Sequence, residues 1–175
     1  MTIIETGRLR LREADADDAP FILRLLNDPA WIDFIGDRGI RDLDGAREYI
    51  TVLRRMYEEH GHGLWVTVLR ETETPVGLCG FVTRDTLEYP DLGYALLGEH
   101  RKRGYAREAA TATLEHGWSR LGLTRIAAIV SPRNAASIAL LHGLGFRFER
   151  PVRLSPDPAA EELSLFLREP GPAGR

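Results

Sequence analysis

The segment from residue 91 to residue 121 most constrains the fold, because it places a strand, a cationic loop and a helix in direct succession. The strand reads DLGYALLG, and a helix pattern runs from Gly104 to Leu121. The loop between them carries three cations before its glycine: Arg101, Lys102 and Arg103. A strand that leads into a helix through a short loop is typical of a sheet covered by helices.

The start of this helix pattern favours anion binding. A helix amino terminus leaves about four backbone N–H groups without intrahelical partners and carries about half a positive charge. Gly104 has no Cβ, so a bulky oxyanion can approach the backbone, and Ala106 keeps the first turn small. The alternative is a solvated loop in which Gly104 only shapes the turn. The Walker spacing and the G-x-G-x-x-G fingerprint are both missing from the sequence.

Strand and helix patterns are mixed along the whole chain. Strand patterns occupy residues 8–13, 64–70, 76–84, 91–98, 125–130, 146–150 and 162–169. Helix patterns occupy residues 15–28, 44–59, 104–121 and a stretch from about Asn134 to a Gly-x-Gly exit. This order predicts an α/β (α+β) sandwich around one mixed sheet. We expect a single domain over residues 1–168, followed by a flexible Pro/Gly-rich tail at residues 169–175.

Composition excludes several classes of function. The net charge of -3 gives no global basic field, so we expect no nucleic-acid partner. No apolar run approaches the roughly 20 residues that cross a bilayer, so we expect no membrane partner. The single cysteine, Cys79, rules out an internal disulfide and fits a cytoplasmic location. His60 and His62 flank a glycine without the cysteine or carboxylate set of a metal site, so we predict no metal.

Several motifs resemble one known family. The pattern R-x-x-G-x-A, read at Arg101, Gly104 and Ala106, resembles the pyrophosphate signature of the GNAT (GCN5-related) N-acetyltransferases. The segments ETGRLRLREADADDA, DLGYALLGEHRKRGYAREA and VSPRNAASIALLHGLGF resemble the branch that contains the ribosomal-protein N-terminal acetyltransferases. The resemblance spans residues 5–168 with the segments in the family's order. It implies the GNAT fold, in which the fourth and fifth strands of a mixed central sheet splay apart between helices on both faces.

The resemblance also implies an acetyl-CoA site in the gap between the strands at residues 91–98 and 125–130. Backbone groups of β-strand residues would hold the pantetheine arm, the loop and helix start would hold the pyrophosphate, and the next helix would contact the linking amides. The implied cofactor-binding residues are Tyr94, Ala95, Leu96, Arg101, Lys102, Arg103, Gly104, Tyr105, Ala106, Asn134 and Ser137.

The resemblance does not by itself identify the catalytic acid and base. Many family members carry a tyrosine acid seven residues after the asparagine, but this chain has Leu141 there. Ser137, one turn earlier, is the substitute that we predict, although its hydroxyl could instead bond the backbone or the cofactor. Asp91 and Glu88 lie at or before the strand start, where either could act as the base. Both could equally be ordinary surface carboxylates.

We expect the acceptor to be a primary amine that meets Trp31 and Phe34, which could alternatively pack in the core. An α-amine with a pKa near 7.7–8.0 needs less help from a base than a lysine near 10.4. The resemblance and this argument favour a protein N-terminal α-amine. A small amine such as an antibiotic, polyamine or amino acid is the alternative, and a non-catalytic CoA-binding module is a further one. We also expect that an exposed strand at residues 162–167 could pair across a homodimer.

Overall fold

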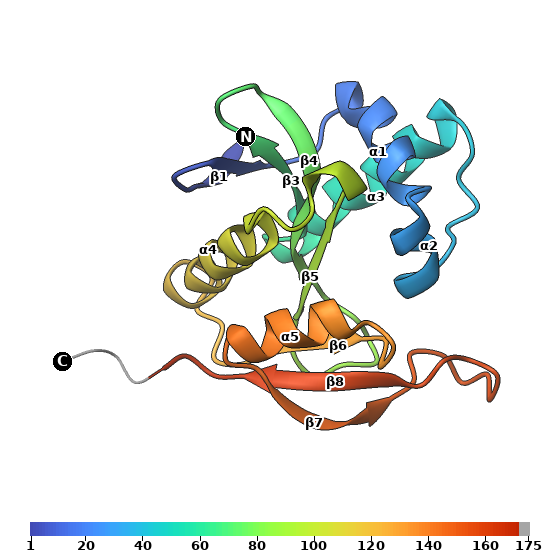
Figure 1. Ribbon diagram of the computed structural model, residues 1–175, viewed down its shortest axis with the longest axis vertical. Coiled ribbons are helices and arrows are strands. Elements are labelled where there is room, and N and C mark those ends of the chain that lie inside the picture. Colours follow the sequence, from blue (N-terminus) through green and yellow to red (C-terminus); the bar gives the residue numbers. More distant parts are fainter. Residues whose placement is uncertain (172–175) are drawn as a thin grey trace.

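The polypeptide forms a mixed sheet with the strand order β1-β2-β3-β4-β5-β6-β8-β7 (Figure 1). The computed structural model describes residues 1–171. The strands are β1 (Thr2–Glu5), β2 (Leu9–Arg12), β3 (Leu64–Leu69), β4 (Thr74–Val82), β5 (Asp91–Leu96), β6 (Ile126–Val130), β7 (Arg147–Val152) and β8 (Leu163–Arg168). Neighbouring strands are antiparallel except β5 and β6, which are parallel.

Helices cover both faces of this sheet. They are α1 (Ala19–Leu26), α2 (Pro29–Phe34), α3 (Leu43–His60), α4 (Tyr105–Ser119) and α5 (Ala135–Gly143), with short 3-10 turns at Ala16–Asp18 and Gly98–His100. One core packs α4 and α5 against the sheet, and a second packs α1, α2 and α3 against its other face. Within residues 1–171, no helix is long and apolar enough to span a membrane. This arrangement confirms the predicted mixed α/β fold with helices on both faces.

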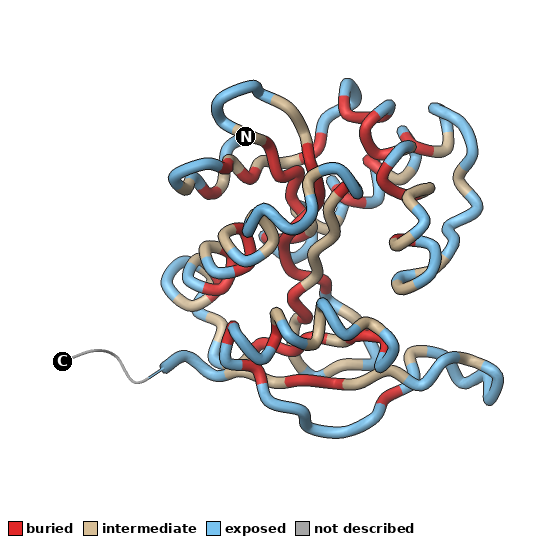
Figure 2. The backbone as a smooth tube through the Cα atoms, in the orientation of Figure 1, coloured by how far each residue is buried: buried red, intermediate tan, exposed pale blue. Residues whose placement is uncertain are grey.

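The central strands are buried on both faces, which explains their nearly continuous apolar sequences. In β3, Trp65 enters the core beneath α4, whereas Val66 and Val68 enter the core beneath α1 and α3. This alternation follows from the two-residue period of a strand. Figure 2 shows buried chain along the middle of the sheet and exposed chain along β7. The interior strands therefore form a rigid frame that connects the two halves of the molecule.

β5 and β6 pair only at the start of β5 and then diverge. β5 pairs with β4 along its full length, from Asp91 opposite Val82 to Leu96 opposite Gly77. Toward β6 its register contains the single pair Asp91 and Ala127 in the described part of the chain. Figure 1 shows β5 running from the β1–β4 half of the molecule toward the half formed by β6, β8 and β7. One edge of β5 is thus left without a strand partner, as expected for splayed strands.

Three short elements differ from the sequence prediction. β1 precedes the first predicted strand, and its register slips by one residue against β2, which shortens the alternating pattern. Asp15 caps a 3-10 turn through a capping box, and α1 begins only at Ala19. Asp28 and Pro29 do not merely end a helix. The Asp28 side chain accepts the N–H of Ala30, and proline in the first turn starts α2.

The expected dimer edge is wrong. β8 contains most of residues 162–167, and it lies between β6 and β7, with hydrogen-bonded partners on both sides. The chain folds back after β7, so β8 fills the space beside β6 and leaves β7 as the edge strand at this end of the sheet, with β1 at the other end. At the end of the chain, residues 169–171 follow β8 without regular structure. Residues 172–175 of the predicted tail lie outside the described residues.

Candidate functional site

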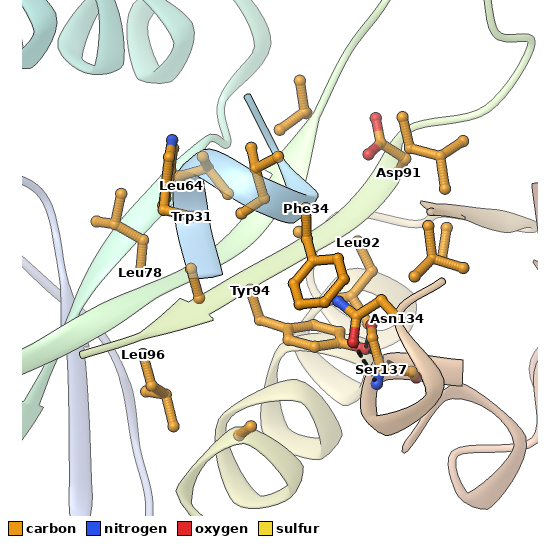
Figure 3. Close-up of a pocket in the computed structure, with 18 of the residues that line it drawn as sticks. Trp31, Phe34, Leu64, Leu78, Asp91, Leu92, Tyr94, Leu96, Asn134 and Ser137 are labelled. Carbon is orange, nitrogen blue, oxygen red and sulfur yellow. Dashed lines mark hydrogen bonds between the residues drawn. The ribbon is translucent and has the colours of Figure 1, made fainter. Parts of the chain in front are cut away.

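A cavity of about 1070 Å³ occupies the gap that β5 and β6 leave. Its walls come from α2 and α3 on one side, β5 and β6 along the floor, and α4 and α5 on the other side. Figure 3 shows Phe34, Tyr94, Asn134 and Ser137 gathered in one part of this cavity, with Asp91 farther along β5. Most of the lining is apolar.

The first turn of α4 forms one end of the cavity. Gly104 is the residue before the helix and adopts a left-handed φ of 80°, a conformation that glycine reaches without strain. A Cβ there would lie 3.3 Å from Nη2 of Arg8, so the loop is also tightly packed. The residues of this region that line the cavity are Arg101, Lys102, Gly104, Tyr105, Ala106 and Arg107. Unpaired N–H groups of the first turn therefore face space that an anion can enter.

The three cations of the loop have different roles. The guanidinium of Arg101 binds the carboxylate of Asp28 and donates to the carbonyl of Leu96, with its Nε 3.1 Å from that oxygen. Arg101 thus ties the start of α2 to the end of β5. Arg103 does not line the cavity, and its carbonyl accepts a hydrogen bond from Arg8. Lys102 lines the cavity beside the helix start.

Sequence reasoning missed two arginines at this end. Arg8, from the loop before β2, lies over the ring of Tyr105, with 4.7 Å between its Cζ and the ring centroid. Its Nε also donates to Glu108, at 2.7 Å. Arg107 follows the recognised motif by one residue and lines the cavity. Local sequence contains no signal for Arg8, because its partners are about 100 residues away.

Tyr94, Ala95 and Leu96 line the floor of the cavity, as the resemblance implied. Backbone groups of a strand point alternately to its two sides, and β4 satisfies one side of β5. The other side lacks a strand from Leu92 onward in the described structure. These free donors and acceptors can bind an extended chain that contains amide groups.

Tyr94 crosses the gap and reaches α5. Its hydroxyl oxygen lies 2.7 Å from Oγ of Ser137. Asn134 precedes α5, and its Oδ1 accepts the N–H of Ser137 at 3.1 Å. Burial raises the pKa of Tyr94 to about 12, although the bond to Ser137 opposes this effect. The phenol is therefore protonated at neutral pH and holds the serine hydroxyl in place.

Leu141 and Cys79 supply no proton donor to this site. Leu141 is buried in the core beneath α5, where the family's tyrosine would otherwise stand. Burial raises the pKa of Cys79 to about 12, and its Sγ lies 3.4 Å from Oγ1 of Thr113 on α4. Tyr94 and Ser137 thus form the hydroxyl pair that the cavity presents.

The two predicted base candidates lie in different places. Asp91 lines the cavity, is 2% exposed, and accepts a hydrogen bond from Nε of Arg84 at 2.9 Å. Burial raises the pKa of Asp91, and Arg84 partly offsets that effect. Glu88 instead lines a separate small pocket, where its carboxylate accepts a hydrogen bond from Tyr89. The structure brings Asp91 into the large cavity and leaves Glu88 outside it.

Trp31 and Phe34, from α2, both line the cavity. Trp31 is buried, so it also packs in the core beneath α1 and α3. The guanidinium of Arg133, at the start of α5, lies over the ring of Phe34 with 5.6 Å to the centroid. The same arginine contacts Asp33, which links α2 to α5 across the cavity. The cavity thus offers an anion-binding end, an extended floor and an aromatic wall.

The comparisons with known proteins agree with this geometry. The family described as acetyltransferase (GNAT) domain matches residues 8–147. The uncharacterised N-acetyltransferase p20 of Bacillus licheniformis is 30% identical over 154 residues, which cover 87% of this chain and 86% of that protein. A crystal structure of an acetyltransferase from Agrobacterium tumefaciens strain C58 has a TM-score of 0.78 and 26% identity, covering 97% of this chain and 95% of that one.

RimL, the ribosomal L7/L12 α-N-protein acetyltransferase solved with coenzyme A, has a TM-score of 0.82. The match covers 97% of this chain and 98% of RimL at 16% identity, and at that identity it shows the fold alone. The family match covers most of the chain and includes the whole of β5 and the α4 start. The chain therefore belongs to the GNAT family of acetyl-CoA-dependent acetyltransferases.

Proposed function

We propose that this enzyme transfers an acetyl group from acetyl-CoA to the α-amine at the amino terminus of a protein. The cavity carries this proposal, because one continuous space connects the first turn of α4, the free edge of β5 and the Tyr94–Ser137 pair. RimL shares the fold and acts on the α-amine of a ribosomal protein, which supports this choice of acceptor.

The residues present fit coenzyme A. The pyrophosphate would meet the N–H groups of Tyr105 and Ala106, with Lys102 beside them. The pantetheine amides would bond to backbone groups of Tyr94 and Leu96 on the free edge of β5, beside Ala95, whose own backbone groups face β4. The amide nitrogen of Asn134 has no bond within the described residues, since the cap uses only its oxygen. It would serve the linking amides.

Acetyl-CoA, when bound, supplies a thioester carbonyl that an amine can attack. A backbone N–H on the free edge of β5, near Tyr94 and the Ser137 hydroxyl, would donate to the carbonyl oxygen and stabilise its developing charge. Asp91 would accept the amine proton, directly or through water, as the new N–C bond forms. Ser137 would donate its proton to the sulfur as the C–S bond breaks, and Tyr94 would hold that hydroxyl in place.

An α-amine suits this set of groups. With a pKa near 7.7–8.0, roughly a tenth or more of an α-amine is neutral at pH 7, whereas a lysine is almost wholly charged. The ion pair with Arg84 opposes the rise that burial causes in the Asp91 pKa, so Asp91 is a weaker base than an equally buried carboxylate without such a partner. A site with one restrained carboxylate favours an acceptor that deprotonates easily.

Two finer expectations accompany this proposal. We propose a cytoplasmic location, which the single buried cysteine suits. We also propose that any homodimer pairs through β7, one of the two edge strands, where Phe148 is 54% exposed. β7 offers unpaired backbone groups on its outer side, and such edges are common pairing surfaces.

Calorimetric titration with acetyl-CoA, with ATP as the control, tests the cofactor. Release of free thiol then tests the acceptor, with amidated peptides that differ in their first residues compared with tyramine, spermidine and an aminoglycoside. Faster turnover of the peptides supports the proposal. Turnover of small amines alone would replace the protein acceptor with a small molecule. Binding of acetyl-CoA without turnover of any amine would indicate a CoA-binding module.

A further inference from the structure

The cavity holds more cations than a pyrophosphate site explains. Among the described residues that line it, the charged ones are Arg38, Arg84, Asp91, Arg101, Lys102 and Arg107. Three of the cations belong to the loop and first turn of α4. The remaining pair, Arg38 and Arg84, comes from the loop between α2 and α3 and from the segment after β4. Asp91 is the one carboxylate in this lining set.

Arg84 lies at the end of β5 opposite the α4 loop. Arg84 binds Asp91, the first residue of β5, and the pyrophosphate loop follows Leu96, the last residue of that strand. Five steps of about 3.3 Å along an extended strand separate these points by about 17 Å. A cofactor whose pyrophosphate sits at α4 would leave this end to the acceptor.

Arg38 and Arg84 act on the same neighbour. Tyr49, on α3, also lines the cavity. Burial raises the pKa of its phenol, and the positive charges of Arg38 and Arg84 oppose that effect. Arg38, Arg84 and Tyr49 thus come from three separate elements and line the same cavity. The cluster contains three groups that can donate hydrogen bonds to an anion.

The charges in this cluster do not cancel. Asp91 occupies the Nε of Arg84 at 2.9 Å, and within residues 1–171 the two Nη groups of Arg84 bind no protein acceptor. Arg38 likewise forms no hydrogen bond or ion pair with the described residues. One carboxylate therefore faces two guanidinium groups, which leaves a net positive charge beside the apolar walls of Trp31 and Phe34.

We propose that Arg38 and Arg84 form an anion subsite at the acceptor end of the cavity, and that the acceptor amine carries a carboxylate close to it. This inference rests on the proposed function and narrows it to acidic amino-terminal segments. Guanidinium groups bind carboxylates in a paired geometry, which gives both affinity and orientation. The same positive charge disfavours polyamines, aminoglycosides and basic peptides.

The test compares amidated peptides Ala-Phe-X-Gly-Gly in which X is Glu, Gln or Lys, so that only the charge near the amine changes. We expect kcat/KM to be about tenfold higher for Glu than for Gln, and lower still for Lys. In Arg38→Gln the preference for Glu over Gln should fall below about twofold, while the acetyl-CoA Kd stays at the wild-type value. Raising the salt concentration should weaken the wild-type preference.

Arg41→Gln is the matched control. Arg41 lies three residues from Arg38 in the same loop but pairs with Asp37 outside the cavity, so its variant should keep the Glu preference. The carboxylate could also come from a free amino acid, so free phenylalanine is compared with phenylalanine amide as an acceptor. A preference for free phenylalanine that Arg38→Gln removes would support the subsite and assign its ligand to an α-carboxylate.

Two results would overturn the inference while leaving the proposed function intact. One is acetylation of the peptides with Lys equal to or better than Glu. The other is a Glu preference that persists in Arg38→Gln. Failure of the proposed function differs from both, because acetyl-CoA would then bind without acetylation of any peptide at all. In that case the anion subsite would fall with it.

Discussion

The hydroxyl of Tyr94 on β5 lies 2.7 Å from the hydroxyl of Ser137 on α5, and this contact bridges the gap between the splayed strands. The tyrosine thereby places a phenol near the position that Leu141 leaves without an acid. The phenol comes from β5 on the floor of the cavity, whereas Leu141 is on α5, and the phenol contacts α5 through the hydroxyl of Ser137. If this contact positions the catalytic hydroxyl, its removal should slow turnover.

Tyr94→Phe should lower kcat by about fivefold, since one hydrogen bond of about 1 kcal/mol no longer orients Ser137. Ser137→Ala should lower kcat further, and the double variant should equal Ser137→Ala, because both changes break the same unit. Steady-state rates at saturating acetyl-CoA measure this. Tyr89→Phe, outside the cavity, is the control. Additive effects of the two changes would show that Tyr94 acts independently of Ser137.

Gly104→Glu should weaken acetyl-CoA binding by about 100-fold, because it places a carboxylate at a helix start that faces phosphate. Gly122→Glu is the matched control. Gly122 has a φ of 67°, so the backbone strain is similar, and a Cβ at that position would have no neighbouring atom within 4 Å. Calorimetric Kd values compare the two variants. Equal Kd values for both would place the pyrophosphate elsewhere.

Asp91→Asn should remove the part of the acidic limb of the kcat/KM profile that Asp91 sets, while the part set by protonation of the acceptor α-amine, with a pKa near 7.7–8.0, remains. Burial raises the pKa of Asp91, so the wild-type rate should fall as the pH drops through that raised pKa and the carboxylate takes up a proton. Glu88→Gln should keep the wild-type profile, because Glu88 lines a different pocket. Measurement of kcat/KM over a pH series with one peptide acceptor compares the wild type, Asp91→Asn and Glu88→Gln. An unchanged limb in Asp91→Asn would assign the base to another group or to water.

Glu108→Gln should reduce stability at neutral pH by about 1 kcal/mol. Burial raises the pKa of Glu108, but hydrogen bonds from Thr6 and Arg8 outweigh it and the pKa is lowered overall. A lowered carboxyl pKa stabilises the fold above the unfolded value of about 4.3, and this contribution is lost as the pH falls through the folded pKa.

The wild-type protein should therefore lose part of its stability on acidification, and Glu108→Gln should lose less over the same interval. Urea unfolding at neutral and acidic pH measures both free energies. Glu115→Gln, an exposed change on the same helix, is the control. A Glu108→Gln variant with the full wild-type pH dependence would show that another carboxyl carries the effect.

Features within one stretch of chain were predictable from the sequence. The loop, Gly104 and the first turn of α4 are contiguous, so their pattern predicted an anion site, and together with the other resembling segments it indicated the family that the comparison confirms. The strands at residues 64–69 and 126–130 were recognisable because burial on both faces makes them almost wholly apolar. Short elements such as β1 and α2 escaped notice, since four to six residues carry little periodicity.

The sequence by itself thus determined the fold class and the family, because the order of strand and helix patterns and the contiguous motifs can be read along the chain. Only the tertiary structure decided which charges share a space. It separated Glu88 from Asp91, which are three residues apart, and joined Tyr94 to Ser137, which are 43 residues apart. It also placed Arg38 and Arg84 in the lining of one cavity. Such contacts depend on how β5 and β6 splay, and packing between distant elements sets that geometry.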